Sequence, residues 1–379
     1  MNRIENIREW GIAILMYLFL QPYFIWGVYN TLHPFLMVAL LIICATSVKV
    51  RNEDVMYKGI LSMIFVWLAF KVNASLLGML YGMIFLASEK LMINSYEKFI
   101  KVFVYTTTIS AIVYLLVVGL GIDLPHHTIP PLNPEKEHMY NAYPFLVVPN
   151  GLEMFKFFGC CDEPGAIGTI CAVILLMRRF DFKQRENILI LLFGLISFSL
   201  FFYMICLIYT LLFARLKYKI LLLSIFAALY LYVSKESLLY ELIFARMQIE
   251  DGQMVGKNRD LGLDEYWYES FKRSNDYWWG LGSGTKAMYN EGGASYKDCI
   301  IEFGAVYFFA YVGAFIMYGI HKLRPSLTNI LIYILVICSV LFQRPFITNI
   351  TYILMIYIPI LSLSNEYNKQ GGIRVQSSI

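Results

Sequence analysis

Apolar runs of nearly membrane-spanning length recur along almost the whole chain, and they restrict it to a membrane-embedded fold. A helix of roughly 20 apolar residues crosses a hydrocarbon core of about 30 Å. The runs that approach this length lie near residues 11–28, 34–48, 58–72, 74–88, 99–120, 163–178, 187–197, 199–214, 218–233, 297–319, 327–342 and 345–363. Because backbone groups in lipid must be paired within their own segment, the runs predict helices. We therefore expect an all-α polytopic integral membrane protein with about 12 transmembrane helices in a single transmembrane domain, residues 1–379.

The composition agrees with this prediction. Apolar residues make up 59% of the chain and charged residues only 15%, whereas about 25% of residues are charged in soluble proteins. A soluble fold could not bury so large an apolar fraction. The region 187–214 is too long for one crossing, so we expect a break at Ser197 and Ser199 that divides it into two short spans.

The positions of lysine and arginine predict the orientation, because short cytoplasmic loops carry an excess of both. With both termini cytoplasmic, the inner segments contain Arg3, Arg8, Lys49, Arg51, Lys58, Lys90, Lys98, Lys101, Arg178, Arg179, Lys183, Arg185, Arg215, Lys217, Lys219, Lys322, Arg324, Lys369 and Arg374. The short outer turns contain only Lys71 and Arg344. Two long segments then face the periplasm, a first outer loop at 121–162 and a second, larger one at 234–296. The first run has no small-residue cleavage pattern, so we expect it to remain in the mature protein.

Charge and cysteine usage exclude several classes of function. The net charge of +4 follows from the loop asymmetry and gives no reason to expect nucleic acid as a partner. The seven cysteines form no CxxC pair and no Cys/His ligand spacing, so we expect no bound metal. Cys160, Cys161 and Cys299 are expected near the outer surface, where an oxidising compartment would permit a disulfide without indicating which pair forms it.

Aromatic residues are concentrated in the second outer loop, which argues against disorder in this segment. Trp267, Trp278 and Trp279 are half of the chain's six tryptophans. Their rings can stack on sugar faces while their polar edges form hydrogen bonds. The alternative is an aromatic belt at the membrane interface.

Three short stretches carry a family resemblance. The first, Lys156-Phe-Phe-Gly-Cys-Cys-Asp-Glu-Pro-Gly-Ala166, leads into an apolar run and resembles the R-x-x-G-x-x-x-E-P-G element of Wzy-type polysaccharide polymerases. Gly159, Glu163, Pro164 and Gly165 match that element, and Lys156 stands where the family usually has arginine. The second stretch is the Ser197-Phe-Ser199 break, which is similar to a serine-containing break after the family's paired short helices.

The third stretch lies in and after the second outer loop. Arg273 precedes the turn Trp279-Gly280-Leu-Gly282-Ser-Gly284, and Glu302-Phe-Gly304 opens the next span. This arrangement resembles the arginine-to-glycine spacing and G-x-G turn of polymerase and ligase outer loops. The histidine often found between these elements is missing, because Ala294-Ser-Tyr296 occupies the region. Its absence tells against the O-antigen ligase.

The resemblance implies a membrane-embedded, metal-independent glycosyltransferase with no bound cofactor. It would join undecaprenyl-diphosphate-linked oligosaccharides into O-antigen or capsular polysaccharide at the periplasmic face of the bacterial inner membrane. Its partners are those lipid-linked substrates and the bilayer, and a chain-length regulator is a candidate protein partner. The alternative within the same superfamily is the O-antigen ligase, which transfers finished polysaccharide from the lipid carrier to lipid A-core.

This chemistry requires cations to stabilise the departing lipid diphosphate and a base near the acceptor hydroxyl. Arg246, Arg259 and Arg273 are the candidate cations, because their planar guanidinium groups suit bidentate contacts to phosphate. Each of them could equally pair with loop carboxylates. Glu163 is the candidate base, although an acid preceding Pro164 also complements the dipole of a helix that begins there.

Other residues are candidates for substrate binding. Gly280, Gly282 and Gly284 could let backbone amides approach a phosphate, but a G-x-G turn is more often only a turn. Lys156 could supply a further charge, Glu302 is a second candidate carboxylate, and Trp278 and Trp279 are candidate sugar-stacking residues.

Two rival classes are less favoured by the sequence. A transporter or flippase should carry ionisable groups deep in its spans, where each costs roughly 2.5 to 3.5 kcal/mol, and Lys71, Glu302 and Arg344 are all predicted near span ends. The chain also shows no duplication into two similar halves. A membrane acyltransferase would need a His-Asp type of pair within the spans, and we identify none.

Overall fold

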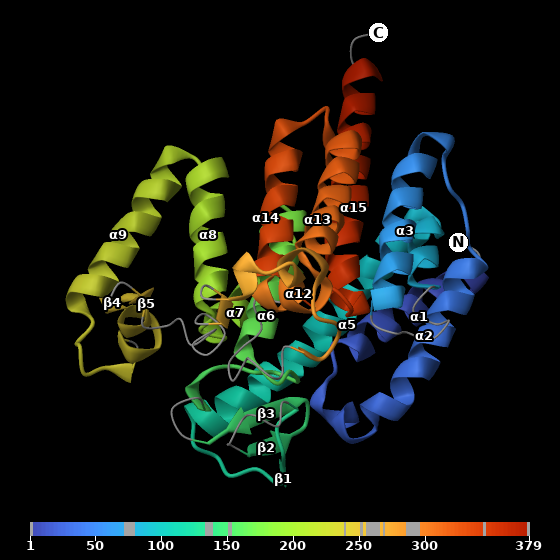
Figure 1. Ribbon diagram of the computed structural model, residues 1–379. Coiled ribbons are helices and arrows are strands. Elements are labelled where there is room, and N and C mark those ends of the chain that lie inside the picture. The colour runs from blue at the N-terminus through green and yellow to red at the C-terminus, as the bar shows by residue number, and fades with distance from the viewer. Residues whose placement is uncertain are drawn as a thin grey trace.

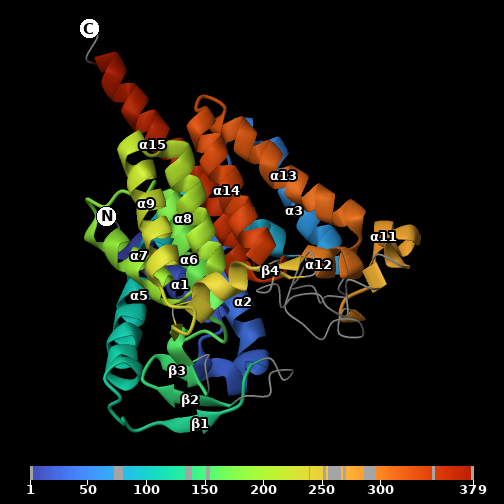
Figure 2. The same ribbon diagram turned by 90° about the vertical axis from the view of Figure 1, so that its left-hand side faces the viewer.

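The computed structural model describes residues 3–71, 80–132, 139–150, 154–238, 240–250, 253–254, 266–267, 270–285, 296–343 and 346–376. Most of these residues are helical, and the helices are gathered into one bundle with a small β-sheet at one end and the C-terminus at the other (Figures 1 and 2). Where the sequence predicted only helices, the first outer loop thus contains strands.

The helices are α1 (Arg3–Phe19), α2 (Tyr29–Ala45), α3 (Val55–Lys71), α5 (Glu89–Tyr114), α6 (Pro164–Met177), α7 (Arg185–Ile196), α8 (Leu200–Phe213), α9 (Leu216–Tyr232), α11 (Asp276–Trp279), α12 (Tyr296–Phe303), α13 (Ala305–Leu323), α14 (Leu327–Gln343) and α15 (Ile350–Gln376). Within the described residues, three helical segments are long and apolar enough to cross a membrane: Tyr23–Ala45, Glu89–Gly119 and Ala305–Leu323. Shorter apolar helices are Pro164–Met177, Leu200–Phe213, Leu327–Phe342 and Ile350–Asn365. The structure is therefore that of a mostly helical protein with candidate membrane spans.

The boundary between the first two helices lies at a different place from the predicted one. The run 11–28 is not a single helix, because α1 ends at Phe19 and a 3-10 helix, Tyr23–Val28, leads into α2. Pro22 has no backbone N–H to donate and disfavours helical geometry in the residue before it. Gln21 accordingly has a positive φ of 56°. Hydropathy alone continues across this proline and does not show the boundary.

The break expected at Ser197 and Ser199 is present, since α7 ends at Ile196 and α8 begins at Leu200. The run 74–88 differs from the prediction: residues 72–79 lie outside the described part, and the rest contains a short 3-10 helix, Leu80–Leu86, in place of an α-helix.

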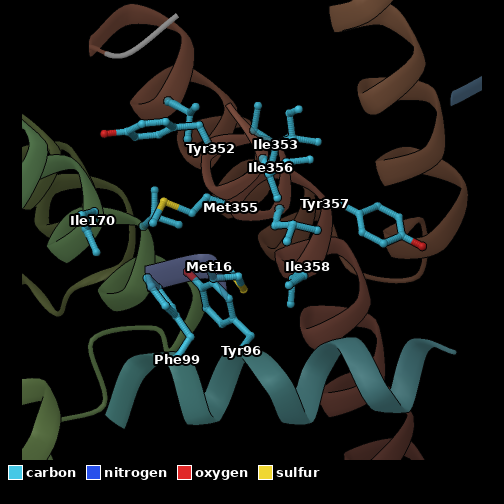
Figure 3. Close-up of a cluster of buried hydrophobic side chains, with 14 of the residues drawn as sticks. Met16, Tyr96, Phe99, Ile170, Tyr352, Ile353, Met355, Ile356, Tyr357 and Ile358 are labelled. Atoms are coloured by element: carbon cyan, nitrogen blue, oxygen red, sulfur yellow. The ribbon is translucent and has the colours of Figure 1, made fainter. Parts of the chain in front are cut away.

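The core of the bundle lies where α1, α5, α6 and α15 meet. Figure 3 shows Met16, Phe99, Ile170 and Met355 of these four helices turned toward one another, and all four side chains are at most 1% exposed. Helix α6 is enclosed along most of its length, because every residue from Ile167 to Met177 is buried. Its apolar composition on all sides fits a helix surrounded by others.

Three short antiparallel strands, β1 (His127–Ile129), β2 (Tyr140–Tyr143) and β3 (Leu146–Pro149), form the sheet of the first outer loop. Tyr140, Val147 and Phe158 give it a small core of its own. The Tyr23 hydroxyl donates a hydrogen bond of 2.5 Å to the Tyr143 carbonyl and ties the sheet to the start of the α2 segment. All seven cysteines, including Cys160 in this region, are free thiols.

Helices α8 and α9 form a hairpin in which α8 packs against α6 and α9 leans away from the rest of the bundle (Figure 1). Large apolar side chains of α9 are exposed along its length, among them Leu216, Ile220, Leu223 and Leu231. Exposing so large an apolar patch to water would be unfavourable. A lipid environment removes that difficulty, which supports a membrane location.

Two glycines of α13 test the packing of the bundle. A Cβ at Gly319 would lie 2.3 Å from the ring of the buried Tyr333, whereas a Cβ at Gly313 would meet nothing within 4 Å. We expect Gly319→Ala to lower the free energy of unfolding by about 1–3 kcal/mol through overpacking. Gly313→Ala should instead be neutral or stabilising by up to about 1 kcal/mol, because alanine is the better helix former. Thermal denaturation in detergent would measure both, and equal melting temperatures would contradict the packing described here.

Candidate functional site

The Glu163-Pro164 element begins the buried helix α6. Pro164 occupies the first helical position, where its missing N–H is not needed. Glu163 precedes it in an extended conformation (φ −150°, ψ 141°), and its side chain forms no hydrogen bond that caps the helix. The half-buried Glu163 therefore lies at the N-terminal end of α6 without serving as a capping group.

The serine break lies beside this helix start. Phe198, between the two serines, has a positive φ of 50°, and the resulting bend turns its carbonyl outward from the helical hydrogen-bond pattern. The Arg246 Nη1 group donates to that carbonyl at 3.2 Å. A contact across 48 residues thus joins one of the predicted cations to the predicted break.

Close backbone packing brings the first motif to the same place. The Phe157 N–H, next to Lys156, donates to the Ile196 carbonyl at 3.1 Å, directly before the break. A Cβ at Gly168 would lie 2.5 Å from the Cβ of Ser199, so α6 and α8 approach closely about one turn after Glu163. The structure therefore brings Phe157, the first turns of α6, the serine break and Arg246 close together, and we call them, with the adjoining Lys156 and Glu163, the helix-start group.

A second group forms around the glycine turn before α13. The Gly282 N–H donates to the Glu302 carbonyl at 3.0 Å, and the Gly284 N–H donates to the Glu302 Oε1 atom at 2.8 Å. Gly280 (φ +78°) and Gly304 (φ +89°) face each other so closely that a Cβ on Gly280 would lie 2.6 Å from the Gly304 nitrogen. We call this arrangement the glycine-turn group.

The hydrogen bonds of the glycine-turn group bear on its predicted role. The amides of Gly280, Gly282 and Gly284 all donate to protein oxygens, the first of them to the Asp276 carbonyl at 2.7 Å. In this conformation they do not point outward as a phosphate cradle would require. The geometry favours the alternative that the motif is a turn, and Glu302 is the residue that holds it closed.

The other predicted residues of the second loop are exposed around this turn. Trp278 and Trp279 are 52% and 59% exposed, and Arg273 ends a short 3-10 helix just before them with its side chain exposed. The Lys71 ammonium group donates to the Trp279 carbonyl and joins the end of α3 to the turn. Arg259 lies outside the described residues.

A third concentration of charge, which the sequence interpretation did not single out, lies at the other end of the bundle. Asp54 is fully buried and accepts a 2.7 Å hydrogen bond from Lys322. Glu89 forms ion pairs with Arg51 at 2.6 Å and with the buried Lys58 and Lys322 at 3.3 Å each. Burial raises the pKa of the Asp54 carboxyl above its ordinary value despite the neighbouring Lys322. We call this set the inner charge cluster.

Sequence reasoning counted Arg51, Lys58 and Lys322 as loop charges, because each lies at the boundary of an apolar run. The available signal was a carboxylate at two such boundaries, Asp54 and Glu89, at the same predicted face of the membrane. Isolated boundary charges usually snorkel to water, and this signal alone does not indicate which cation pairs with which carboxylate.

The chain matches no known protein family, no curated protein and no solved structure. Among the described residues, no group of three or more His, Cys, Asp or Glu side chains has the arrangement of a metal site. Any functional assignment must therefore rest on the geometry of the three groups.

Glu302 offers a test of the glycine turn. Glu302→Gln keeps a side-chain oxygen that can accept the Gly284 N–H, so we expect a change in unfolding free energy within about 0.5 kcal/mol. Glu302→Leu removes the acceptor and should cost about 0.5–1.5 kcal/mol. Thermal denaturation together with limited proteolysis at the turn would compare them. A glutamine variant as unstable as the leucine variant would show that the charge, not the hydrogen bond, holds the turn.

The inner charge cluster makes a second prediction. Asp54→Asn leaves a buried ammonium group without its nearest counter-ion, and we expect a loss of about 3 kcal/mol in unfolding free energy. Adding Lys322→Met should recover part of that loss, because the unpaired charge is then gone. Glu53→Gln is the matched control, since its pair with Arg51 is more than half exposed on both sides and should contribute at most about 1 kcal/mol. Additive effects of the two buried substitutions in chemical denaturation would refute the coupling.

Proposed function

We propose that this protein is a Wzy-type polysaccharide polymerase, a membrane glycosyltransferase that joins lipid-diphosphate-linked oligosaccharides. The observation that supports the proposal most is the hydrogen bond from Arg246 to the Phe198 carbonyl. It brings a cation of the second outer loop to the serine break, which packs against α6 at Gly168, five residues after Glu163.

The proposed reaction needs the residues of this group in complementary roles. A hydroxyl oxygen of the acceptor sugar attacks the anomeric carbon of the donor, and the bond from that carbon to the lipid diphosphate breaks. Glu163 takes the proton of the hydroxyl group. Arg246 stabilises the negative charge on the departing undecaprenyl diphosphate, a task for which guanidinium is suited because it stays charged and presents several parallel N–H groups.

The remaining predicted residues would act at the edges of this site. Lys156 would add positive charge next to the helix start, and Arg273 with Trp278 and Trp279 would contact the sugar chain or its diphosphate from the glycine-turn group. The proposed arrangement has about 12 transmembrane helices with both termini in the cytoplasm of a bacterium. Both outer groups would then face the periplasm from the inner membrane.

Surface polysaccharide from cells lacking the gene provides the direct test. Complementation with wild type should restore a ladder of chain lengths, whereas Arg246→Ala and Glu163→Gln should leave single repeats on the lipid anchor, with polymerisation reduced on the order of 100-fold. Arg273→Ala should have a smaller effect, because its side chain is exposed. Lys272→Ala, which changes the neighbouring exposed cation, is the matched control and should restore the full ladder.

Other outcomes would assign a different function. Loss of all attached repeats, with long chains still accumulating on the carrier lipid, would indicate the ligase. A deletion strain with an unchanged ladder would reject both members of the superfamily. Full ladders from Arg246→Ala and Glu163→Gln at normal expression would return these two residues to structural roles.

A further inference from the structure

A cavity of about 270 Å³ opens beside the inner charge cluster, at the beginning of α5. Its lining consists of Arg51, Glu89, Lys90, Ile93, Lys322, Leu361, Ser364 and Asn365. These residues come from the α2–α3 connection, from the first turns of α5, from the end of α13 and from the middle of α15. The cavity is therefore built from segments distant in sequence and exists only in the folded bundle.

The cavity lies far from the outer groups described above. The glycine-turn group directly precedes α13, whereas Lys322 lies near the end of that helix. At about 1.5 Å per residue, a helix of this length separates its ends by more than 25 Å. A ligand of this cavity would thus be distinct from the substrates proposed for the periplasmic face.

Positive charge exceeds negative charge around the cavity. The cations are Arg51, Lys90 and Lys322, which line the cavity, and Lys58, which lies behind Glu89. The carboxylates in contact with these cations are Glu89, the buried Asp54 and the exposed Glu53. The N-terminus of the 26-residue helix α5 adds the positive end of its dipole, and its N-cap Ser88 forms no side-chain capping bond.

The polar groups behind the lining are also incompletely bonded. Among the described residues, the ammonium group of the buried Lys58 lies 3.3 Å from the Glu89 Oε1 atom as an ion pair, without a well-directed hydrogen-bond partner. Lys58 is 0% exposed, so water at the surface does not supply one. Buried polar groups are nearly always bonded in native proteins, so a buried ammonium group that lacks a directed acceptor calls for an explanation such as a nearby ion.

We propose that this cavity binds a phosphate group, and that the phosphate belongs to the headgroup of an anionic membrane lipid. Arg51 and Lys90 at the exposed side would provide charge-assisted hydrogen bonds to the phosphate oxygens, and Ser364 and Asn365 would provide neutral donors. Ile93 and Leu361 give the cavity an apolar wall against which the first carbons of an acyl chain can lie. Basic pockets between membrane helices on the cytoplasmic side are known to take anionic headgroups in this way.

The test uses the purified full-length protein in a neutral detergent. Thermal stability would be measured while phosphatidic acid, phosphatidylglycerol or phosphatidylcholine of the same chain length is added, with inorganic phosphate as a separate arm. We expect the two anionic lipids to raise the melting temperature in a saturable manner and the zwitterionic lipid to leave it unchanged. Arg51→Gln/Lys90→Gln should raise the half-saturating lipid concentration at least tenfold.

Controls keep the result independent of folding and of the proposed enzyme activity. Lys101→Gln removes an exposed lysine from the same helix outside the cavity and should bind lipid like wild type. Lys90→Glu changes only an exposed side chain, so it tests the site even if the double variant is unstable. If inorganic phosphate saturates the cavity and competes with the lipid, the cavity is a phosphate site, but its ligand is the free anion and the lipid assignment is wrong. Equal lipid effects on wild type, Lys90→Glu and Lys101→Gln would overturn the proposal.

Discussion

The burial of helix α6 is the packing interaction on which the rest of the structure depends. Its neighbours α7, α8, α14 and α15 enclose it on all sides, so none of the residues from Ile167 to Met177 is exposed. Arg178 fixes one end by donating to Glu186 at 2.9 Å and Asn187 at 3.1 Å. A helix held in this way cannot tilt or slide without disrupting several interfaces, and it therefore holds Glu163 at a fixed place relative to α8.

The parts of the fold that could be predicted are those set by local sequence signals. Pro164 and the serines of the break are local signals that act within their own segments, so the start of α6 and the division between α7 and α8 follow from the sequence. The end of α1 was missed because hydropathy continues across Pro22. Asp54 and Lys322 are 268 residues apart, and one sequence contains no information that pairs charges over such a separation.

The candidate sites show the same division between residue type and geometry. Arg246 could be chosen as a candidate cation from its chemistry. Its acceptor, the Phe198 carbonyl, depends on a backbone bend that the residue types do not predict. The amides of Gly282 and Gly284 were correctly located in a turn, yet their directions are set by φ angles and by Glu302. Sequence therefore indicates which groups are present, and only the fold determines whether their donors face a substrate or the protein.

Arg246 also depends on helix α9, which leans away from the rest of the bundle. Phe244, two residues before it, packs against Phe226 and Tyr230 of α9 with ring centroids 5.5 Å apart in both pairs. Helix α9 exposes apolar side chains along its length, as a helix that faces lipid would. Because Arg246 spans from the α9 side to the carbonyl that precedes α8, its hydrogen bond closes the open end of the hairpin. The position of Arg246, and with it the geometry of the helix-start group, is therefore coupled to that of α9.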